Sequence, residues 1–592
     1  MNTIPYRTTP VALRTAALLL GLALVLPASL SATTYTWTGP SDGLWSADSN
    51  WNPAGGPPGT GDIANIFNPA ASLLSISYDS SASGSLGSFN LNNTSGAAIQ
   101  TLLELNRSLT LTTGTSTLFA TVSNATTRIQ LNGTSSLTIG SGAVLEIGTN
   151  STSEQAYYTA IKLGSGYTGA GVFVNGELKL INGVSSSAGF TLQGPLTIAG
   201  GTLTAQGNNA VENPVFTGNF TTTGTNTIRA TTTGTSTTTS AKFTFQGAVN
   251  SFSSGTTFTG IANATTSNYI NNPTGLIFNP TSGTPNQSIT MGVVQDFAVL
   301  NSTASLNATE TFVSTATNNG IGSVLLNATA AGTSGSPTRL TFKLGGNLVY
   351  AGNSGQSPFT FLFNSQSNIT QAIDLNGFGY DSGAFKSFTP FPSGAGSGVG
   401  TNFVQFVNSG SSSIAGGNGV FKAAKFGFTQ TNLEVGVGSG VILQATGAGQ
   451  LNDLGHGTSG QSIDAASTFY YTGAGTSALK SDRSVGALVI GTGAGSGSTL
   501  ALSSNLTAAG LTTVNTGSTL NLTNATGTSV GTAGTYTLAT AGLSGSGSFT
   551  NNATGAAATS VTINGAGTHT FSGVISDHSG TNTLSLVYSG TG

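Results

Sequence analysis

The residues that could do chemistry are few in this 592-residue chain, and they are widely spaced. It has 18 acidic residues and three histidines, and only 6% of its residues are charged. Acid/base hydrolysis of a polysaccharide needs two carboxyl groups within roughly 5–10 Å of each other. Stacked segments could bring distant acids together, but with so few acids we expect no catalytic pair. The closest groupings are Asp42 with Asp48, Glu146 with Glu154, and Asp374 with Asp381.

The sequence gives equally little support for a histidine that acts as the base in nucleophilic catalysis. The histidines are His456, His569 and His578. His456 lies in a glycine-flanked loop, DLGHGTSG, with Asp453 three residues before it, and this is the most chemistry-like local cluster. Serine is so abundant that a nearby serine carries no information. We expect three solvated turn residues and no catalytic residue.

Metal and cofactor signatures are also weak. The chain has no cysteine, no H-x-x-x-H pair and no calcium-binding glycine-aspartate repeat. Asp48-Ser49-Asn50 has D-x-N spacing without the rest of an EF-hand loop. Gly164–Gly169 matches GxGxxG, but 85 glycines make chance matches common, and no helix is predicted after it. The sequence therefore predicts no cofactor and no metal.

All three tryptophans, Trp37, Trp45 and Trp51, lie within fifteen residues near the N-terminus. One interpretation is a platform on which carbohydrate stacks. The other is an aromatic plug over the open end of a β-solenoid, which would otherwise expose unpaired backbone and bare core. We favour the plug, because the terminal coil of a solenoid must be capped for solubility.

The elements that must position these residues are short β-strands. Apolar residues recur two apart, as in Leu109/Leu111, Leu137/Ile139 and Leu178/Leu180, which is the period of a strand with one buried face. Threonine between them suits a pleated surface, and Gly and Asn at the breaks suit tight turns. The mature chain shows no sustained helical stripe. It is predicted to be all-β.

Of two all-β architectures, a β-sandwich and a parallel β-solenoid, the solenoid fits better. Sandwiches give domains of roughly 100 residues with longer loops, whereas the strands here are short and the breaks are close together. Low charge also favours stacked coils, since stacking would set like charges above one another, whereas Ser, Thr and Asn ladders tolerate it. We expect roughly 20–25 residues per coil.

The two ends of the chain carry a family resemblance. Trp37-Thr38-Gly39, Asn50-Trp51 and Pro57–Asp62 resemble the opening of autotransporter-associated β-strand repeat proteins, and Phe571–Ile575 (FSGVI) resembles the repeat itself. The resemblance implies a surface-displayed or secreted, single-stranded right-handed parallel β-helix, as in passenger domains of Gram-negative bacteria. It also implies a further strand and an anchor after Gly592, so we expect the chain to be part of a longer protein.

The N-terminus predicts export. Arg7 and Arg14 precede an apolar run at 16–26, and Pro27 and small residues follow, with cleavage expected after Ser31. The run is too short for a membrane anchor. We therefore expect export through the Sec pathway to the cell exterior or the outer-membrane surface, with no membrane span in the mature chain.

Composition divides the chain into five regions. These are a signal peptide (1–31), a tryptophan-rich cap (32–70), regular β-helix repeats (71–210), an irregular phenylalanine-rich β-helix with longer loops (211–440), and autotransporter-associated repeats that are apparently truncated (441–592).

The sequence predicts a non-enzymatic passenger that acts in adhesion or in cell-envelope or matrix structure. Its partners would be extracellular glycans or other cells. A net charge of −3 argues against nucleic acid. The alternative is a β-helix that binds or degrades polysaccharide.

Overall fold

The computed structural model describes residues 32–591 apart from internal segments. The predicted signal peptide, His456, His578 and Glu154 lie outside the described residues. The internal segments left out are 96, 98, 121–124, 150–157, 183–189, 208–212, 233–240, 262–274, 294, 317–323, 329–337, 350–360, 364–368, 383–386, 389–390, 393–401, 429–432, 456–461, 494, 525–530, 554–556 and 578–581.

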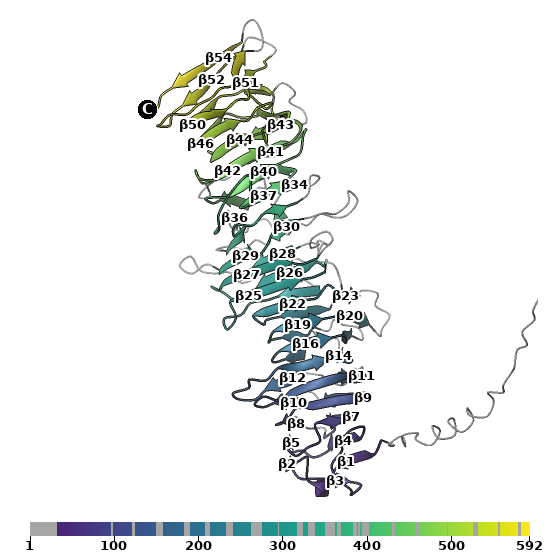
Figure 1. The fold of residues 1–592 in the computed structure, drawn as a ribbon. Coiled ribbons are helices and arrows are strands. Elements are labelled where there is room, and N and C mark those ends of the chain that lie inside the picture. The colour runs from purple at the N-terminus through teal and green to yellow at the C-terminus, as the bar shows by residue number, and fades with distance from the viewer. Residues whose placement is uncertain are drawn as a thin grey trace, which may run out of the picture.

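The described chain winds as a parallel β-solenoid, which appears in Figure 1 as one long stack of strands. The fold class predicted from the alternating pattern, all-β with a solenoid architecture, is confirmed. Among the described strand pairs, only β1–β3 and β48–β49 are antiparallel, and every other pair is parallel. The only helix in the described part of the chain is the 3₁₀ turn η1 (Asp48–Asn50). No described helix is long and apolar enough to cross a membrane.

The largest sheet has 21 strands. From β7 to β23 it supplies two of the three faces of each coil, since its long strands β9 and β11 each run through both of these faces. Its strands are β1 (Thr34–Trp37), β3 (Trp51–Asn52), β4 (Ile63–Asn68), β6 (Ser85–Leu86), β7 (Ser88–Asn93), β9 (Leu109–Ala120), β11 (Ser136–Thr149), β13 (Gly171–Val174), β14 (Glu177–Asn182), β16 (Leu196–Ala199), β17 (Thr202–Gly207), β19 (Phe220–Thr223), β20 (Asn226–Thr232), β22 (Val249–Phe252), β23 (Thr256–Thr259), β25 (Asn286–Met291), β27 (Asn307–Ser314), β29 (Thr338–Leu344), β32 (Ile369–Asp374), β36 (Asn402–Val407) and β39 (Leu433–Val437).

A 13-stranded sheet forms the other face of these coils. Its strands are β2 (Gly43–Leu44), β5 (Leu74–Tyr78), β8 (Gln100–Leu105), β10 (Thr126–Leu131), β12 (Tyr158–Leu163), β15 (Phe190–Leu192), β18 (Val215–Phe216), β21 (Lys242–Phe245), β24 (Gly275–Phe278), β26 (Phe297–Asn301), β28 (Val324–Ala328), β31 (Phe361–Phe363) and β35 (Phe391–Pro392).

Further sheets take over towards the C-terminus. A ten-stranded sheet holds β30 (Leu348–Val349), β33 (Tyr380–Asp381), β37 (Val420–Ala423), β40 (Ile442–Ala445), β42 (Thr468–Tyr471), β44 (Ala487–Ile490), β46 (Leu506–Val514), β50 (Leu538–Gly545), β52 (Ala558–Ile563) and β54 (Thr583–Tyr588). A six-stranded sheet holds β41 (Leu451–Asp453), β43 (Gly475–Lys480), β45 (Ser498–Leu502), β47 (Thr519–Asn521), β51 (Ser548–Asn551) and β53 (Val574–Asp577), and two small sheets hold β34 (Ser387–Phe388) with β38 (Lys425–Phe426) and β48 (Thr523–Asn524) with β49 (Gly534–Thr535).

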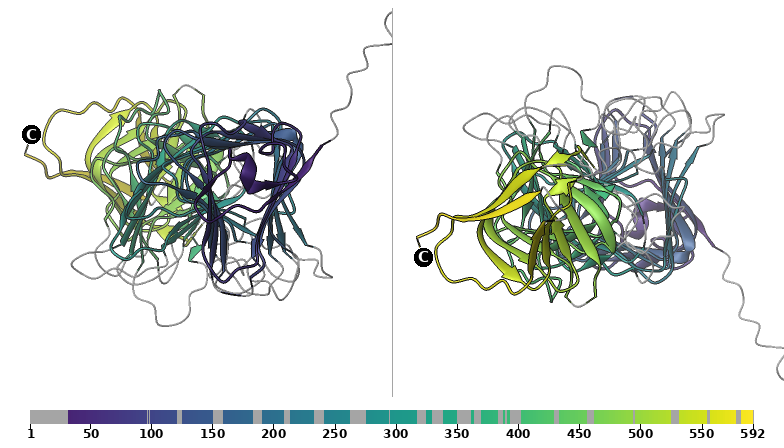
Figure 2. Two further views of the ribbon diagram at one scale, coloured as in Figure 1. Left: turned by 90° about the horizontal axis from the view of Figure 1, so that it is seen from below. Right: turned by 90° about the horizontal axis from the view of Figure 1, so that it is seen from above.

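The strands form because inward residues alternate with outward ones and stack on equivalent residues of the next coil. In β11, Leu137, Ile139, Leu145 and Ile147 are buried, and Leu137 is in register with Leu109 of β9. Apolar side chains therefore meet apolar side chains along most of the axis. One continuous hydrophobic core runs from Trp37 to Val561. The end-on views of Figure 2 show the strands surrounding this shared interior.

The length of a coil varies more than the expected 20–25 residues. Ala487 is in register with Thr468, only 19 positions earlier, whereas Phe421 is in register with Tyr380, 41 positions earlier. The expectation was too narrow, because loops of any length can leave the corners of a coil while the strands keep their pairing.

The middle of the rod is built differently from its ends. Between 260 and 347, the described strands belong to only two sheets. The third face of the N-terminal coils ends at β23, and the sheet that forms a third face of the later coils begins at β30. Phenylalanine fills this part of the interior and that of the coils just before it. The rings of Phe216, Phe245 and Phe278 stack with centroids 5.4 and 5.3 Å apart, and Phe297 stacks on Phe312 at 5.4 Å.

Candidate functional site

The three tryptophans pack together at the N-terminal end of the solenoid. Strands β1 and β3 pair antiparallel and bring Trp37 opposite Trp51. The Trp51 ring lies 4.6 Å from that of Trp45 and 5.1 Å from that of Trp37, both edge to face, and Trp45 lies 5.0 Å from Tyr78 of the next coil. The Trp51 indole nitrogen donates a 2.8 Å hydrogen bond to the Trp45 carbonyl oxygen.

This cluster forms an aromatic cap. All three indoles are buried, and they are continuous with the hydrophobic core. A sugar could reach their faces only if the cap opened, because stacking needs an exposed ring. The geometry therefore favours the plug interpretation over the carbohydrate platform.

Of the acidic residues that could have formed a catalytic pair, Asp374 and Asp381 have structural partners, and Asp42 and Asp48 occupy turn positions. Asp374 accepts hydrogen bonds from the amide and hydroxyl of Ser409, at 2.9 and 2.7 Å, whereas Asp381 forms an ion pair with Lys422 at 2.7 Å. Asp48 lies in the first turn of η1, and Asp42 has a left-handed backbone with φ of 60°, which aspartate tolerates.

The four ion pairs among the described residues all join separate coils. Three connect residues in direct register on neighbouring strands: Glu146 with Lys179, Asp381 with Lys422, and Asp453 with Lys480. The fourth spans two coils, because Arg229 reaches Glu177 at 2.7 Å beside the hydroxyl of Thr204, which lies between them. In these four pairs, opposite charges are stacked on different coils.

Asp453, which precedes His456 in the sequence, is largely buried, with one oxygen 3.2 Å from Lys480 and the other accepting the Gly455 amide at 3.0 Å. His569 is exposed. It lines an open hollow of about 420 Å³ with apolar residues that include Leu543, Phe571 and Leu586. The hollow brings no carboxylate to the imidazole, so it offers no acid/base pair.

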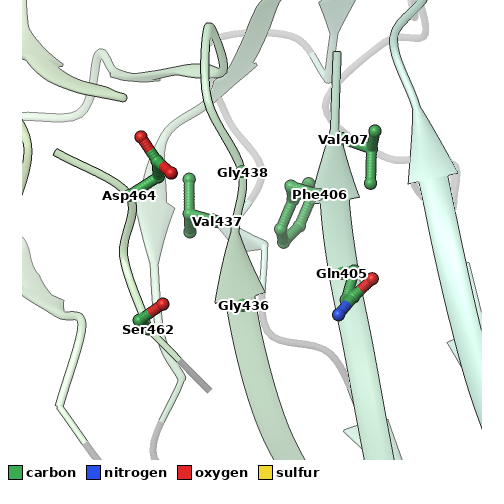
Figure 3. Close-up of a pocket in the computed structure, with 8 residues that line it drawn as sticks. All are labelled: Gln405, Phe406, Val407, Gly436, Val437, Gly438, Ser462 and Asp464. Carbon is green, nitrogen blue, oxygen red and sulfur yellow. The ribbon is translucent and has the colours of Figure 1, made fainter. Parts of the chain in front are cut away.

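A groove on the outer face of the solenoid is the polar concavity that the sequence did not reveal. Because Phe406 and Val437 turn inward, Gln405 and Val407 of β36 and Gly436 and Gly438 of the next coil face outward. The coil after that contributes Ser462 and Asp464, since Ile463 is in register with Val437. We call this concavity the glycine groove, and Figure 3 shows its two glycines between the flanking side chains.

The glycine groove exists because the middle one of its three coils has glycine, and so no side chain, at the outward positions 436 and 438. Its volume is about 160 Å³. Backbone groups on its floor already form hydrogen bonds between coils. The Gly438 amide donates to the Phe406 carbonyl, and the Asp464 amide donates to the Val437 carbonyl, both at 2.8 Å. A ligand could reach the Ser462 hydroxyl and the Asp464 carboxylate, one oxygen of which accepts the Ala466 amide. Such groups hydrogen-bond hydroxyls and amides. The alternation Val435-Gly436-Val437-Gly438 was the only signal, and it is lost among 85 glycines.

Metal and cofactor ligands do not gather in the described part of the chain. No group of three or more His, Cys, Asp and Glu residues there could share a metal ion. Gly164–Gly169 forms the turn between β12 and β13, with no helix after it to receive a phosphate.

No protein-family model, no curated protein and no solved structure matches the chain. Fold and site geometry therefore have to carry the functional argument.

Proposed function

We propose that the protein is an exported, non-enzymatic β-solenoid that serves as a rod-shaped scaffold in adhesion or in cell-envelope or matrix structure. The observation that carries this proposal is the unbroken core from Trp37 to Val561, which makes the described chain one extended body. The resemblance of its ends to autotransporter-associated repeats supports display as a passenger.

The site chemistry supports a structural role as well. Four of the acidic residues hold neighbouring coils together as ion-pair partners, and Asp374 hydrogen-bonds the following coil through Ser409. Their carboxylates are therefore engaged in stability, which leaves little acid/base chemistry for catalysis.

Export and shape can be tested together. The full chain with a C-terminal epitope tag should leave the cytoplasm of a Gram-negative host, with its N-terminus at Ala32, and small-angle scattering should give a rod on the order of 100 Å long. Leu20→Arg, which places a charge in the apolar run, should leave the chain unprocessed inside the cell. Export of that variant, or a compact scattering profile of the parent, would contradict the proposal.

Glycan binding is a second candidate, and the glycine groove is the observation that favours it. Purified protein on a glycan array should then bind a polar polysaccharide, and Asp464→Asn combined with Ser462→Ala should reduce binding at least tenfold. Asparagine keeps the oxygen that accepts the Ala466 amide at 2.8 Å, so the fold should survive. Asp48→Asn, an exposed acid at the far end, is the matched control.

A further inference from the structure

Glu310 is a buried acid without a partner. It lies on β27 between Ala308 and Phe312, and all three side chains face the interior. Its exposed fraction is 0%, and neither carboxylate oxygen has a hydrogen-bond partner. A lone carboxylate in such a place is very costly, because nothing replaces the water it has lost.

The coils below Glu310 present further acceptors. Gln287 of β25 is its direct register partner and is also buried. The Gln287 amide nitrogen donates to the carbonyl oxygens of Phe245 and Gly247, at 3.2 and 2.8 Å, and the Asn250 amide nitrogen donates to the same Gly247 oxygen at 3.0 Å. Both amide nitrogens are used, whereas Gln287 Oε1 and Asn250 Oδ1 have no donor.

Among the described residues, no charged side chain on the neighbouring strands faces this cluster. On β29, Arg339 and Lys343 alternate with the buried Leu340 and Phe342 and therefore turn outward. Strands β25, β26 and β28 carry no charged residue. The nearest other acid in this part of the chain, Asp296, precedes β26 and is only partly buried. No neighbouring strand therefore supplies a cation to Glu310.

A metal ion fits this cluster poorly. Calcium takes about six to eight oxygen ligands. The three side chains offer four unpaired oxygens, and the rings of Phe297, Phe312 and Phe342 fill the adjoining interior. A proton needs no extra space. It turns the carboxylate into a donor, and neighbouring strands about 4.8 Å apart place register partners within reach of each other.

We propose that Glu310 is folded into the core as a neutral carboxylic acid that donates a hydrogen bond to Gln287 Oε1, and that losing this proton loosens the surrounding coils. The rod then has a pH-dependent weak point in its middle. The location favours this, because between 260 and 347 the described strands belong to two sheets, so fewer ladders hold each coil. Burial raises the pKa of Glu310 well above its ordinary value, which agrees with the geometry.

The sign of the effect follows from proton counting. Between the ordinary pKa of glutamate, about 4.3, and the raised pKa of Glu310, the folded protein holds one more proton than the unfolded chain. The free energy of unfolding contributed by this group is therefore fully present at acidic pH and falls as the pH rises through that interval.

The test is urea unfolding of the purified protein across a pH series, with Glu310→Gln beside the parent. Glutamine imitates the neutral acid. We expect the parent's unfolding equilibrium constant to rise by up to tenfold per pH unit relative to that of the variant, because one pKa unit corresponds to a tenfold change. Glu146→Gln, which removes a surface carboxylate, is the control and should keep the parent's slope.

Two outcomes would overturn the proposal. One is the same pH dependence in the parent and in Glu310→Gln. The other is a cation site: calcium or sodium that stabilises the parent at alkaline pH but not the variant. If the variant does not fold, infrared spectroscopy of the parent still decides. A carbonyl band of a protonated carboxyl is required at a pH about one to two units above the ordinary pKa of glutamate, and its absence there refutes the neutral acid.

Discussion

At the scale of single residues, polar and aromatic side chains in this protein mainly join one coil to the next. Trp45 packs on Tyr78 of the next coil, Lys179 pairs with Glu146 33 positions earlier, and Asp374 holds the following coil through Ser409. Residue types that suggest chemistry in the sequence are therefore used for stacking.

The cap can be tested at Trp45, whose side chain is fully buried. Trp45→Ala should lower the free energy of unfolding of the N-terminal coils by about 3–5 kcal/mol, because it leaves a large cavity. All tryptophans lie in the cap, so fluorescence during urea unfolding monitors the cap alone, and circular dichroism monitors the whole stack. Leu44→Ala, at a half-exposed neighbour, should change little. An unchanged fluorescence midpoint in Trp45→Ala would show that the cluster does not stabilise this end.

The stability contributed by Glu177, which binds Arg229 and Thr204, should change with pH in the opposite direction to that contributed by Glu310. Burial alone would raise the pKa of Glu177, but hydrogen bonds from Thr204 and Arg229 and the charge of Arg229 outweigh it, so its pKa lies below the ordinary value. Its stabilisation is present at neutral pH and is lost as the pH falls through the ordinary pKa towards the lowered one. Glu177→Gln should cost less than about 1 kcal/mol at pH 7, since the pair is partly exposed, and nothing in acid. An equal loss at both pH values would indicate a packing effect.

At the scale of elements, glycines at the corners set how closely successive coils approach. Gly194, Gly218 and Gly247 lie at the same corner of three successive coils, and a Cβ on Gly218 would lie 2.1 Å from the Gly194 carbonyl. No side chain fits there without moving the backbone, so these corners require glycine irrespective of φ.

Gly218→Ala should therefore destabilise the rod by about 1–3 kcal/mol, as overpacking does. Gly346→Ala is the matched control, since a Cβ there meets no atom within 4 Å. Hydrogen exchange should show loss of protection in β16, β19 and β22 for the first variant only. Equal protection in the two variants would mean that the corner relaxes without cost.

At the scale of the whole molecule, the two ends of the described solenoid differ. The N-terminal end is covered by buried tryptophans, whereas Val574, Ile575, Leu586, Val587 and Tyr588 near the other end are 39–59% exposed. Strand β54 has β52 as its only described ladder neighbour, and it carries neither lysine nor proline to protect its edge.

We therefore expect the purified chain to self-associate through β54, with a mass that increases with concentration in analytical ultracentrifugation. Leu586→Lys should lower the association constant at least tenfold, because a charge on an edge strand opposes pairing. Leu44→Lys, an equally exposed position at the capped end, should leave it unchanged. A parent that stays monomeric at every concentration would refute this expectation.

The alternating pattern by itself predicted the strands, their inward faces and the solenoid, because a period of two and a scarcity of charge are local properties of the chain. The clustered tryptophans also predicted a cap, but a carbohydrate platform remained the other interpretation until the structure placed all three indoles in the core. Register is not local. Coils range from 19 to 41 residues, so sequence spacing could not show that Gln287 lies beside Glu310, that Lys422 lies beside Asp381, or that Gly436 and Gly438 lie between Gln405 and Asp464. Only the tertiary structure decided those neighbours, because the loop lengths at the corners determine which residues stack.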